Sequence, residues 1–495
     1  MKSDGYLLGL DIGSSSVKAA LVDIHSGKAV AQAQSPEHEM EIQSPHLGWA
    51  EQDPELWWQH VVISVKKCLA LVDKQKVKAI GIGYQMHGLV IVDEKFKPLR
   101  PAIIWCDSRA VEIGNKAFHD LSESYCLSHF LNSPGNFTAS KLKWVQQNEP
   151  SIHKKIHKAM LPGDYIALKL TGEARTTNTG LSEGIFWDFT SDSLSNQLLN
   201  YFGFDSKLIC DQVEVFSAQG KLCQGACDEL GLSSETLVSY RAGDQPNNAF
   251  ALGALHPGEA AANGGTSGVI YSVTDQNSFD SKSRVNIFLH VNHQRNKKRN
   301  GILLCINGTG ILNSWLRKTI GGSYEKMNEL ASTVEIGSDG LQFIPFGNGA
   351  ERILENKIAQ ASMHGIDFNR HSQAHLSRAA QEGIAFAFNY GAEILSEMNV
   401  KTQTIKAGHA NLFLSPVFRE AFVNSLNLNL ELFDTNGAIG AALGAGVGAG
   451  IYSSFDEALS RLTKHLTVVP EKEKTEKYQQ AYSRWKSKLN ELKLI

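Results

Sequence analysis

Apolar and polar residues alternate along the chain in two stretches with the same outline. The first, Leu7–Lys18, begins with alternating apolar residues, narrows to small hydroxyl residues and continues as an apolar run to Asp23. The second, Ala261–Asp275, repeats this pattern about half the chain length later. Alternation interrupted by a short turn predicts a β-hairpin in each copy. Two such hairpins at this spacing favour a duplicated α/β domain.

The turns of the two predicted hairpins have the composition of a phosphate-binding loop. They contain Gly13, Ser14 and Ser15 in the first copy and Gly265 and Thr266 in the second. Glycine lets the backbone approach an anion closely, while turn N–H groups and hydroxyls donate to it. A single turn of this kind more often only joins two strands. Its occurrence in both copies favours phosphate binding, and we expect the two turns to face each other across a cleft.

The pattern next predicts a helix followed by a buried strand. Asp53 is a suitable N-cap, Pro54 suits the first helical turn, and apolar residues recur at helical spacing as far as Leu69. The continuous apolar run at 77–84 is typical of a strand buried on both faces.

Two strand ends carry candidate sugar-binding groups. Met86 and His87 directly follow the run at 77–84, and Trp105 and Asp107 follow a second short apolar run. In open α/β sheets ligands bind beyond the carboxyl ends of strands. An aromatic face and a fixed carboxylate acceptor suit a sugar. Packing at a strand end is the alternative for Met86 and His87.

The composition and net charge of the chain argue against some classes of function. The 495 residues are 42% hydrophobic and carry a formal net charge of −3, which is ordinary for a globular protein of two or three domains. We therefore expect no nucleic-acid or membrane partner. Seven scattered cysteines suggest reduced thiols, and no spanning segment is evident, so we expect a cytoplasmic protein.

Several segments together resemble the FGGY carbohydrate kinases, and among them those that act on xylulose. The resemblance is strong in the first half of the chain and weaker in the second. It is carried by 11–18, 49–55, 85–88, 100–105, 137–144, 161–165, 242–245 and 265–268, and more loosely by 365–382 and 437–444.

The resemblance implies an α/β fold with two ribonuclease-H-like domains, the actin and hexokinase ATPase fold, around a central cleft. ATP and Mg²⁺ would be the cofactors, and a small-molecule sugar would be the substrate. We expect a sugar-binding domain over residues 1–252, a nucleotide-binding domain over 253–450, and a helical extension over 451–495 that packs on the second domain.

Asp244 is the expected catalytic residue. It follows Gly243 and precedes an Ala-rich helix start, and the resemblance aligns it with the family's general base, which takes the proton from the attacking sugar hydroxyl. The alternative is a helix N-cap, a common role for Asp. Asp11 is the expected Mg²⁺ carboxylate, acting through water because Mg²⁺ gives up its hydration shell reluctantly.

Nucleotide contacts are expected at Gly310, Asn313, Gly408 and Asn411. Gly408 stands where the family has a Gly-rich loop below adenine, although only one of the usual glycines is present. The resemblance implies transfer of the ATP γ-phosphate to a ketopentose, D-xylulose in the first instance. A kinase for another ketose or polyol, such as ribulose or glycerol, and a non-catalytic sugar sensor are the alternatives. The oligomeric state stays open, with a homodimer among the options.

The second half contains two further predicted helices and one Gly-rich segment. An apolar stripe from Gln373 to Met398 predicts one long helix, and Tyr478, Trp485 and Leu489 give the C-terminal charged segment a face for docking on the second domain. Gly444–Gly448 invites a dinucleotide-binding interpretation, but no strand precedes it, so close helix packing is favoured.

Overall fold

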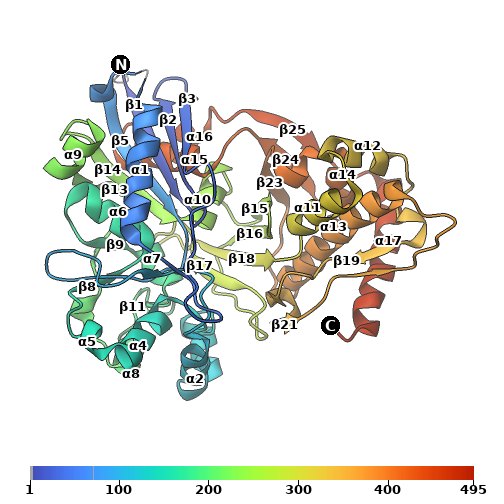
Figure 1. The fold of residues 1–495 in the computed structure, drawn as a ribbon, viewed down its shortest axis with the longest axis horizontal. Coiled ribbons are helices and arrows are strands. Elements are labelled where there is room, and N and C mark those ends of the chain that lie inside the picture. Colours follow the sequence, from blue (N-terminus) through green and yellow to red (C-terminus); the bar gives the residue numbers. More distant parts are fainter. Residues whose placement is uncertain (1–3, 71) are drawn as a thin grey trace. The chain divides into compact units, whose positions relative to one another are not determined.

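The computed structural model describes residues 4–70 and 72–495, which divide into two compact units (Figure 1). Unit 1 comprises the chain up to Gly253 together with Phe288–Asn300 and Thr435–Leu462. Unit 2 comprises Ala254–Ile287, Gly301–Asp434 and Thr463–Ile495. Within the described part of the chain, no helix combines the length and apolarity that crossing a membrane requires.

Unit 1 is built on a six-stranded sheet that contains the first predicted hairpin. Strands β1 (Tyr6–Ile12) and β2 (Val17–Asp23) pair antiparallel, as predicted. β1 also pairs in parallel with β5 (Val77–Tyr84), which in turn pairs in parallel with β14 (Leu237–Gly243). The carboxyl ends of β1, β5 and β14 therefore lie at one edge of the sheet. β3 (Ala29–Ser35) and β13 (Phe216–Lys221) complete it.

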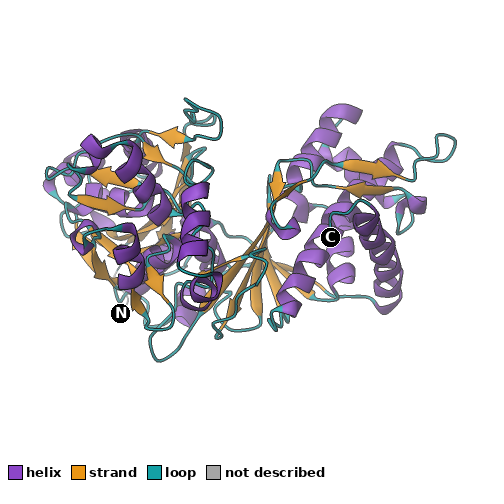
Figure 2. Cartoon of the chain, turned by 90° about the horizontal axis from the view of Figure 1, so that it is seen from below, coloured by secondary structure: helices purple, strands orange, loops and turns teal. Residues whose placement is uncertain are grey.

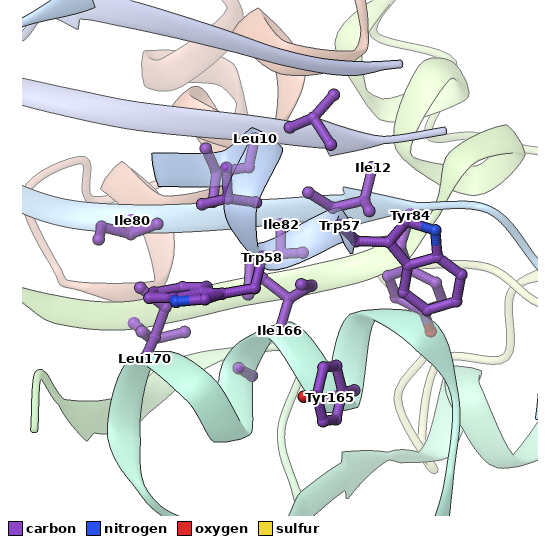
Figure 3. Packing of buried hydrophobic residues seen from close by; sticks show 14 of the residues in the cluster. Leu10, Ile12, Trp57, Trp58, Ile80, Ile82, Tyr84, Tyr165, Ile166 and Leu170 are labelled. Atoms are coloured by element: carbon purple, nitrogen blue, oxygen red, sulfur yellow. The ribbon is translucent and has the colours of Figure 1, made fainter. Parts of the chain in front are cut away.

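One face of this sheet is covered by helices α1 (Pro54–Cys68) and α6 (Pro162–Thr171). The predicted start of α1 is confirmed, because the Asp53 side chain accepts a hydrogen bond of 2.9 Å from Glu55 N. Figure 3 shows Trp57 and Trp58 of α1 beside the sheet's apolar side chains, where they form a closely packed core. This helix therefore exists both because it is capped and because it buries two large indoles.

The other face is covered by α15 (Gly437–Gly448), which corrects the expected domain boundaries. A Cβ added at Gly9 would lie 1.8 Å from Ala438 O, and one at Gly81 would lie 1.9 Å from Ala441 O. Only glycine lets the helix backbone approach the strands this closely. The Gly-rich segment is therefore a packing helix, as favoured, but it belongs to unit 1 and not to a second domain over 253–450. The segment to Leu462 also belongs to unit 1.

Unit 2 contains the second hairpin in a sheet that repeats the first. β15 (Glu259–Gly264) and β16 (Gly268–Thr274) pair antiparallel, and β15 pairs in parallel with β23 (Thr404–Gly408), which pairs in parallel with β24 (Asn429–Phe433). The order β24-β23-β15-β16 thus matches β14-β5-β1-β2 of unit 1. The duplication predicted from the hairpins is confirmed in the sheet topology.

Further strands extend this seven-stranded sheet at both ends, with helices beside it (Figure 2). β25 (Lys464–Val468) pairs antiparallel with β24, and β17 (Asn286–Leu289) and β18 (Asn300–Ile306) form the other end of the sheet. The predicted long helix is α13 (Gln373–Glu397). The C-terminal helix α17 (Lys472–Glu491) docks on unit 2 as predicted, where buried Trp485 donates a 2.7 Å hydrogen bond to Phe343 O.

Candidate active site

The turn between β1 and β2 is held by its own backbone and by neighbouring loops. Gly13 N donates to Ser16 O at 3.0 Å, and Met40 N donates to Ser15 O at 2.8 Å. The exposed Trp105 donates from its indole to Ser14 Oγ at 3.3 Å. The structure therefore brings a predicted sugar platform and a predicted phosphate turn together within unit 1, with the Ser15 side chain exposed.

Asp11 lies at the end of β1, opposite Lys18 of β2. Its carboxylate approaches the first residue of α15 so closely that a Cβ at Gly437 would lie 2.8 Å from Asp11 Oδ2. The helix N-terminus favours a negative charge there. Burial nevertheless raises the pKa of Asp11, against the opposing effect of Lys18. Because the buried negative charge of Asp11 is unfavourable, a cation bound beside it would stabilise the ionised carboxylate.

Asp244 is the first residue of α10 (Asp244–Ala251), immediately after β14. The N-cap is Gly243, so the alternative prediction that Asp244 caps this helix is wrong. Loss of solvent and the negative charge of Asp11 raise the pKa of Asp244 to about 7, although hydrogen bonds from Gln245 oppose the rise. Asp244 is only partly buried, so a ligand can reach it. A carboxyl that titrates near neutrality suits proton transfer.

His87 has a strained backbone conformation, and its ring is held by one backbone carbonyl and two aromatic side chains from other segments. Its φ of 61° lies in the left-handed region, which is uncommon for a residue with a side chain. Its Nδ1 lies 2.9 Å from Glu183 O, and its ring contacts those of Phe137 and Phe288 at 4.8 and 5.0 Å between centroids. Strain supported in this way is typical of functional sites.

Lys141 fixes the two loops that carry the predicted sugar residues. Its buried ammonium donates to His87 O at 2.8 Å and to Ile104 O at 2.9 Å. Burial lowers the pKa of Lys141 to about 7, against the opposing charge of Asp107. One side chain therefore sets the spacing of the Met86–His87 loop and the loop after Ile104.

Two of the predicted sugar contacts are buried side chains. Asp107 is fully buried, and its oxygens accept from Ala50 N at 2.6 Å and from Arg109 Nη2 and Nε at 2.6 and 2.9 Å. The Arg109 backbone N–H also donates to it, at 2.9 Å. No carboxylate lone pair is left for a sugar, which corrects the prediction for Asp107. Met86 is also buried, and it packs against Gly243.

Glu183, which no sequence motif predicted, lies beside the proposed base. It ends α7 (Asn178–Glu183) and is buried, with its carboxylate so close to the start of α10 that a Cβ at Gly243 would lie 2.3 Å from its Oε2. Burial and the charge of Asp244 raise its pKa well above the usual value. An acid between apolar and small residues, Leu181-Ser182-Glu183-Gly184, was the only available signal.

In unit 2 the turn after β15 is bound to the start of α11 (Gly310–Ile320). Gly310 N donates to Gly265 O and Ile311 N donates to Thr266 O, each at 3.1 Å. A Cβ at Gly310 would lie 2.1 Å from Gly265 O, so this contact requires glycine. The side chain of Thr266 remains exposed. In the first turn of α11, the buried Oδ1 of Asn313 has no hydrogen-bond partner within the described residues and is free to accept from a ligand.

The remaining predicted nucleotide residues lie beside the same turn. β23 ends at Gly408, and Asn411 follows with a left-handed φ of 53°. The amide nitrogen of Asn411 would lie 3.8 Å from a Cβ at Gly265. Unit 2 thus gathers residues from three segments around one Gly-Thr turn, as a nucleotide site would require.

Comparison with known proteins identifies the family. Residues 6–251 match the N-terminal domain of the FGGY family of carbohydrate kinases. The chain belongs to the FGGY family of carbohydrate kinases. It is an ATP-dependent carbohydrate kinase, with a sugar and ATP as its substrates.

Relatives with this architecture align with this FGGY kinase from end to end. It is 26% identical to a xylulose kinase of Staphylococcus xylosus, covering 97% of this chain and 99% of that one, and 28% identical to a xylulose kinase of Escherichia coli, covering 95% and 96%. A xylulose kinase structure from Brucella ovis superposes with a TM-score of 0.89 at 27% identity, covering 98% of this chain and 99% of that one. The actin and hexokinase type of fold is therefore established for the chain.

Proposed function

We propose that this FGGY kinase transfers the γ-phosphate of ATP to a hydroxyl of a ketopentose, D-xylulose in the first instance, with Asp244 as general base. The observation that carries the proposal is the Asp244 carboxyl, which is partly accessible and has a pKa of about 7. The choice of sugar rests on the relatives, since xylulose kinases align with this chain over nearly all of both lengths. Glycerol and ribulose are the competing acceptors.

The proton transfer follows from the position of Asp244. Its carboxylate takes the proton of the acceptor hydroxyl as the oxygen forms a bond to the γ-phosphorus. The bond from that phosphorus to the bridging oxygen breaks, and ADP leaves with the electron pair. Asp244 then carries the proton until solvent removes it. Because its pKa is near 7, Asp244 can both accept the hydroxyl proton and release it to solvent at neutral pH.

The other residues orient the substrates. His87 and Trp105 would contact sugar hydroxyls and the sugar's apolar face, while Met86 and Lys141 support the loops behind them. The phosphates would contact the turns, for which we propose Gly13, Ser14, Ser15, Gly265 and Thr266. Gly310, Asn313, Gly408 and Asn411 would hold the nucleoside. Positioning and charge stabilisation supply most of the rate in such transfers.

The residues present fit Mg²⁺. Asp11 and Asp244 offer the hard oxygen ligands that this ion prefers, and the charge of Asp11 raises the pKa of Asp244. A cation near Asp11 would relieve that repulsion and favour the ionised base. When bound, the ion would neutralise phosphate charge, with Asp11 as its nearest proposed carboxylate.

The test is ADP release by the full chain with ATP, Mg²⁺ and one acceptor at a time. D-xylulose is expected to give the highest kcat/KM in a panel that also contains ribulose, other ketopentoses, pentitols and glycerol. A higher kcat/KM for another acceptor would show that xylulose is not the preferred substrate, but it would leave the proposed kinase activity standing. Absence of turnover with every acceptor, combined with calorimetric sugar binding, would favour a sugar sensor.

A further inference from the structure

Three metal-ligating side chains meet at one edge of the unit 2 sheet, outside the residues assigned to the kinase reaction. They are His409, Asp434 and His465, and one ligand atom from each lies within 4.8 Å of the others. His465 Nδ1 and Asp434 Oδ2 are 3.9 Å apart, and the two imidazole rings are 3.8 Å apart between centroids.

The backbone fixes this arrangement, because the three residues lie at the ends of neighbouring strands. His409 follows β23, Asp434 follows β24, and His465 is the second residue of β25. His409 N donates to Phe433 O at 3.0 Å, and Asp434 N donates to Thr463 O at 3.1 Å. The Cα positions therefore follow from the sheet pairing and do not depend on a mobile loop.

The three side chains are also available to a ligand. Over the described residues, no hydrogen bond engages the imidazole of His409 or His465 or the carboxylate of Asp434. The 3.9 Å separation of His465 and Asp434 is too long for a direct hydrogen bond. Lys464, the neighbour of His465 in β25, is paired with Glu431 at 2.6 Å, and Arg419, whose charge acts on His409, donates to Phe413 O at 2.8 Å.

We propose that His409, Asp434 and His465 bind one divalent transition-metal ion of the Zn²⁺ type. Two imidazoles and one carboxylate, with a water in the fourth position, form a common zinc ligand set. Imidazole favours Zn²⁺, Cu²⁺ and Ni²⁺, whereas Mg²⁺ prefers oxygen ligands. The site is therefore chemically distinct from the magnesium expected at Asp11. The two imidazole planes are stacked at 19° to each other, so one ring has to turn about its side-chain bonds before all three ligand atoms reach the bond lengths of about 2.0–2.2 Å that zinc requires.

Calorimetric titration of the full chain with Zn²⁺ alone, after chelator treatment and at constant pH, tests the site. The wild type is expected to show one saturable site, and H465A and D434N are each expected to bind at least tenfold more weakly. Loss of a supporting residue alone typically costs 10- to 100-fold in metal affinity. H119A, which removes an isolated exposed histidine of α2 (Val111–Asp120), is the matched control and should bind like wild type.

The experiment separates this site from other metal binding. Zinc taken up by cysteines would persist equally in H465A, and excess Mg²⁺ should not displace the specific ion. H465Q preserves side-chain size if H465A proves unstable, and thermal unfolding without metal checks both variants. Absence of saturable binding by the wild type, or unchanged affinity in H465A or H465Q and in D434N, would overturn the proposal. Because the experiment measures zinc binding, its result does not depend on which sugar the kinase phosphorylates.

Discussion

Units 1 and 2 hold their predicted ligand groups by different physical means. In unit 1 the proposed sugar residues are positioned by buried ionisable side chains: Lys141 donates hydrogen bonds to two loops, and Glu183 packs against the start of α10. In unit 2 the turn at Gly265 is positioned by backbone hydrogen bonds to α11 and by a glycine contact. We therefore expect the proposed sugar site to be sensitive to charge substitutions and pH, and the proposed nucleotide site to be sensitive to any side chain added at a glycine.

The largest effect is expected for Asp244→Asn. Asn preserves the shape of the side chain but cannot accept the proton, so kcat should fall by about 10² to 10⁴. Sugar binding should weaken less, because the amide keeps hydrogen-bonding capacity. Steady-state kinetics with calorimetric sugar titration measures both. A variant that keeps most of its kcat would move the base elsewhere, and Asp107 could not supply it because Arg109 and Ala50 occupy its oxygens.

Lys141→Met should have the next largest effect. Methionine fills similar space but removes both hydrogen bonds that the Lys141 ammonium donates, at a cost of about 1–3 kcal/mol, while Ile104 O keeps its hydrogen bond from Asp107 N at 3.2 Å. We expect lower stability in urea unfolding and a sugar KM raised more than the ATP KM. The exposed Lys116→Met is the control. Equal changes in both KM values would show that Lys141 serves the whole fold and not the sugar loops.

Glu183 can be tested with two substitutions of opposite expectation. Burial and the charge of Asp244 raise the pKa of Glu183 and so favour its neutral carboxyl, which Gln imitates. Glu183→Gln should therefore stay within about threefold of wild type, whereas Glu183→Ala, which removes the contact with Gly243, should raise the sugar KM about tenfold, or about 1.4 kcal/mol. If Gln proves as damaging as Ala, the ionised form is the one that matters.

Gly310→Ala tests the contact between α11 and the turn at Gly265 in unit 2. The added methyl would meet Gly265 O, so the turn must shift, and the ATP KM should rise severalfold while the sugar KM stays unchanged. Gly225→Ala, in α9 (Gln224–Leu230), where a Cβ would meet no atom within 4 Å, is the control. A rise in the sugar KM alone would break the proposed division between the units.

The smallest effect is a pH-dependent gain in stability for Asp244→Asn. The pKa of Asp244 is about 7 in the folded state, above its ordinary value of 3.8, so the folded state binds more protons than the unfolded state between these pH values. Its contribution to stability is present below pH 3.8 and is lost as pH rises towards 7. The variant should therefore melt a few degrees above wild type at pH 8 and show a smaller difference at pH 5. Identical differences at both pH values would contradict the raised pKa.

Local patterns predicted most of the fold. The sequence was sufficient to predict both hairpins, α1, α13 and the docking of α17. Each of these depends on periodicity, a cap or a turn close in sequence. The placement of α15 could not be predicted from local patterns, because its partners Gly9 and Gly81 lie hundreds of residues earlier in the chain.

The candidate site was only partly predictable for the same reason. Strand ends pointed to His87, Trp105 and Asp244, but burial decides which polar groups remain free. Asp107 and Arg109 are two residues apart, and the sequence could not show that the Arg109 guanidinium hydrogen-bonds to the Asp107 carboxylate. Glu183 and Lys141 lie on helices whose approach to the strand ends depends on tertiary packing.

The return of the chain to unit 1 at α15 has a consequence for synthesis on the ribosome. Until Gly437–Gly448 has been translated, the face of the first sheet around Gly9 and Gly81 lacks its cover, although the rest of that sheet was completed at Gly243. A nascent or truncated chain ending before residue 437 therefore exposes apolar strand surface. Such fragments should be prone to aggregation and degradation, so a gene for the first half alone would not yield a stable sugar-binding protein.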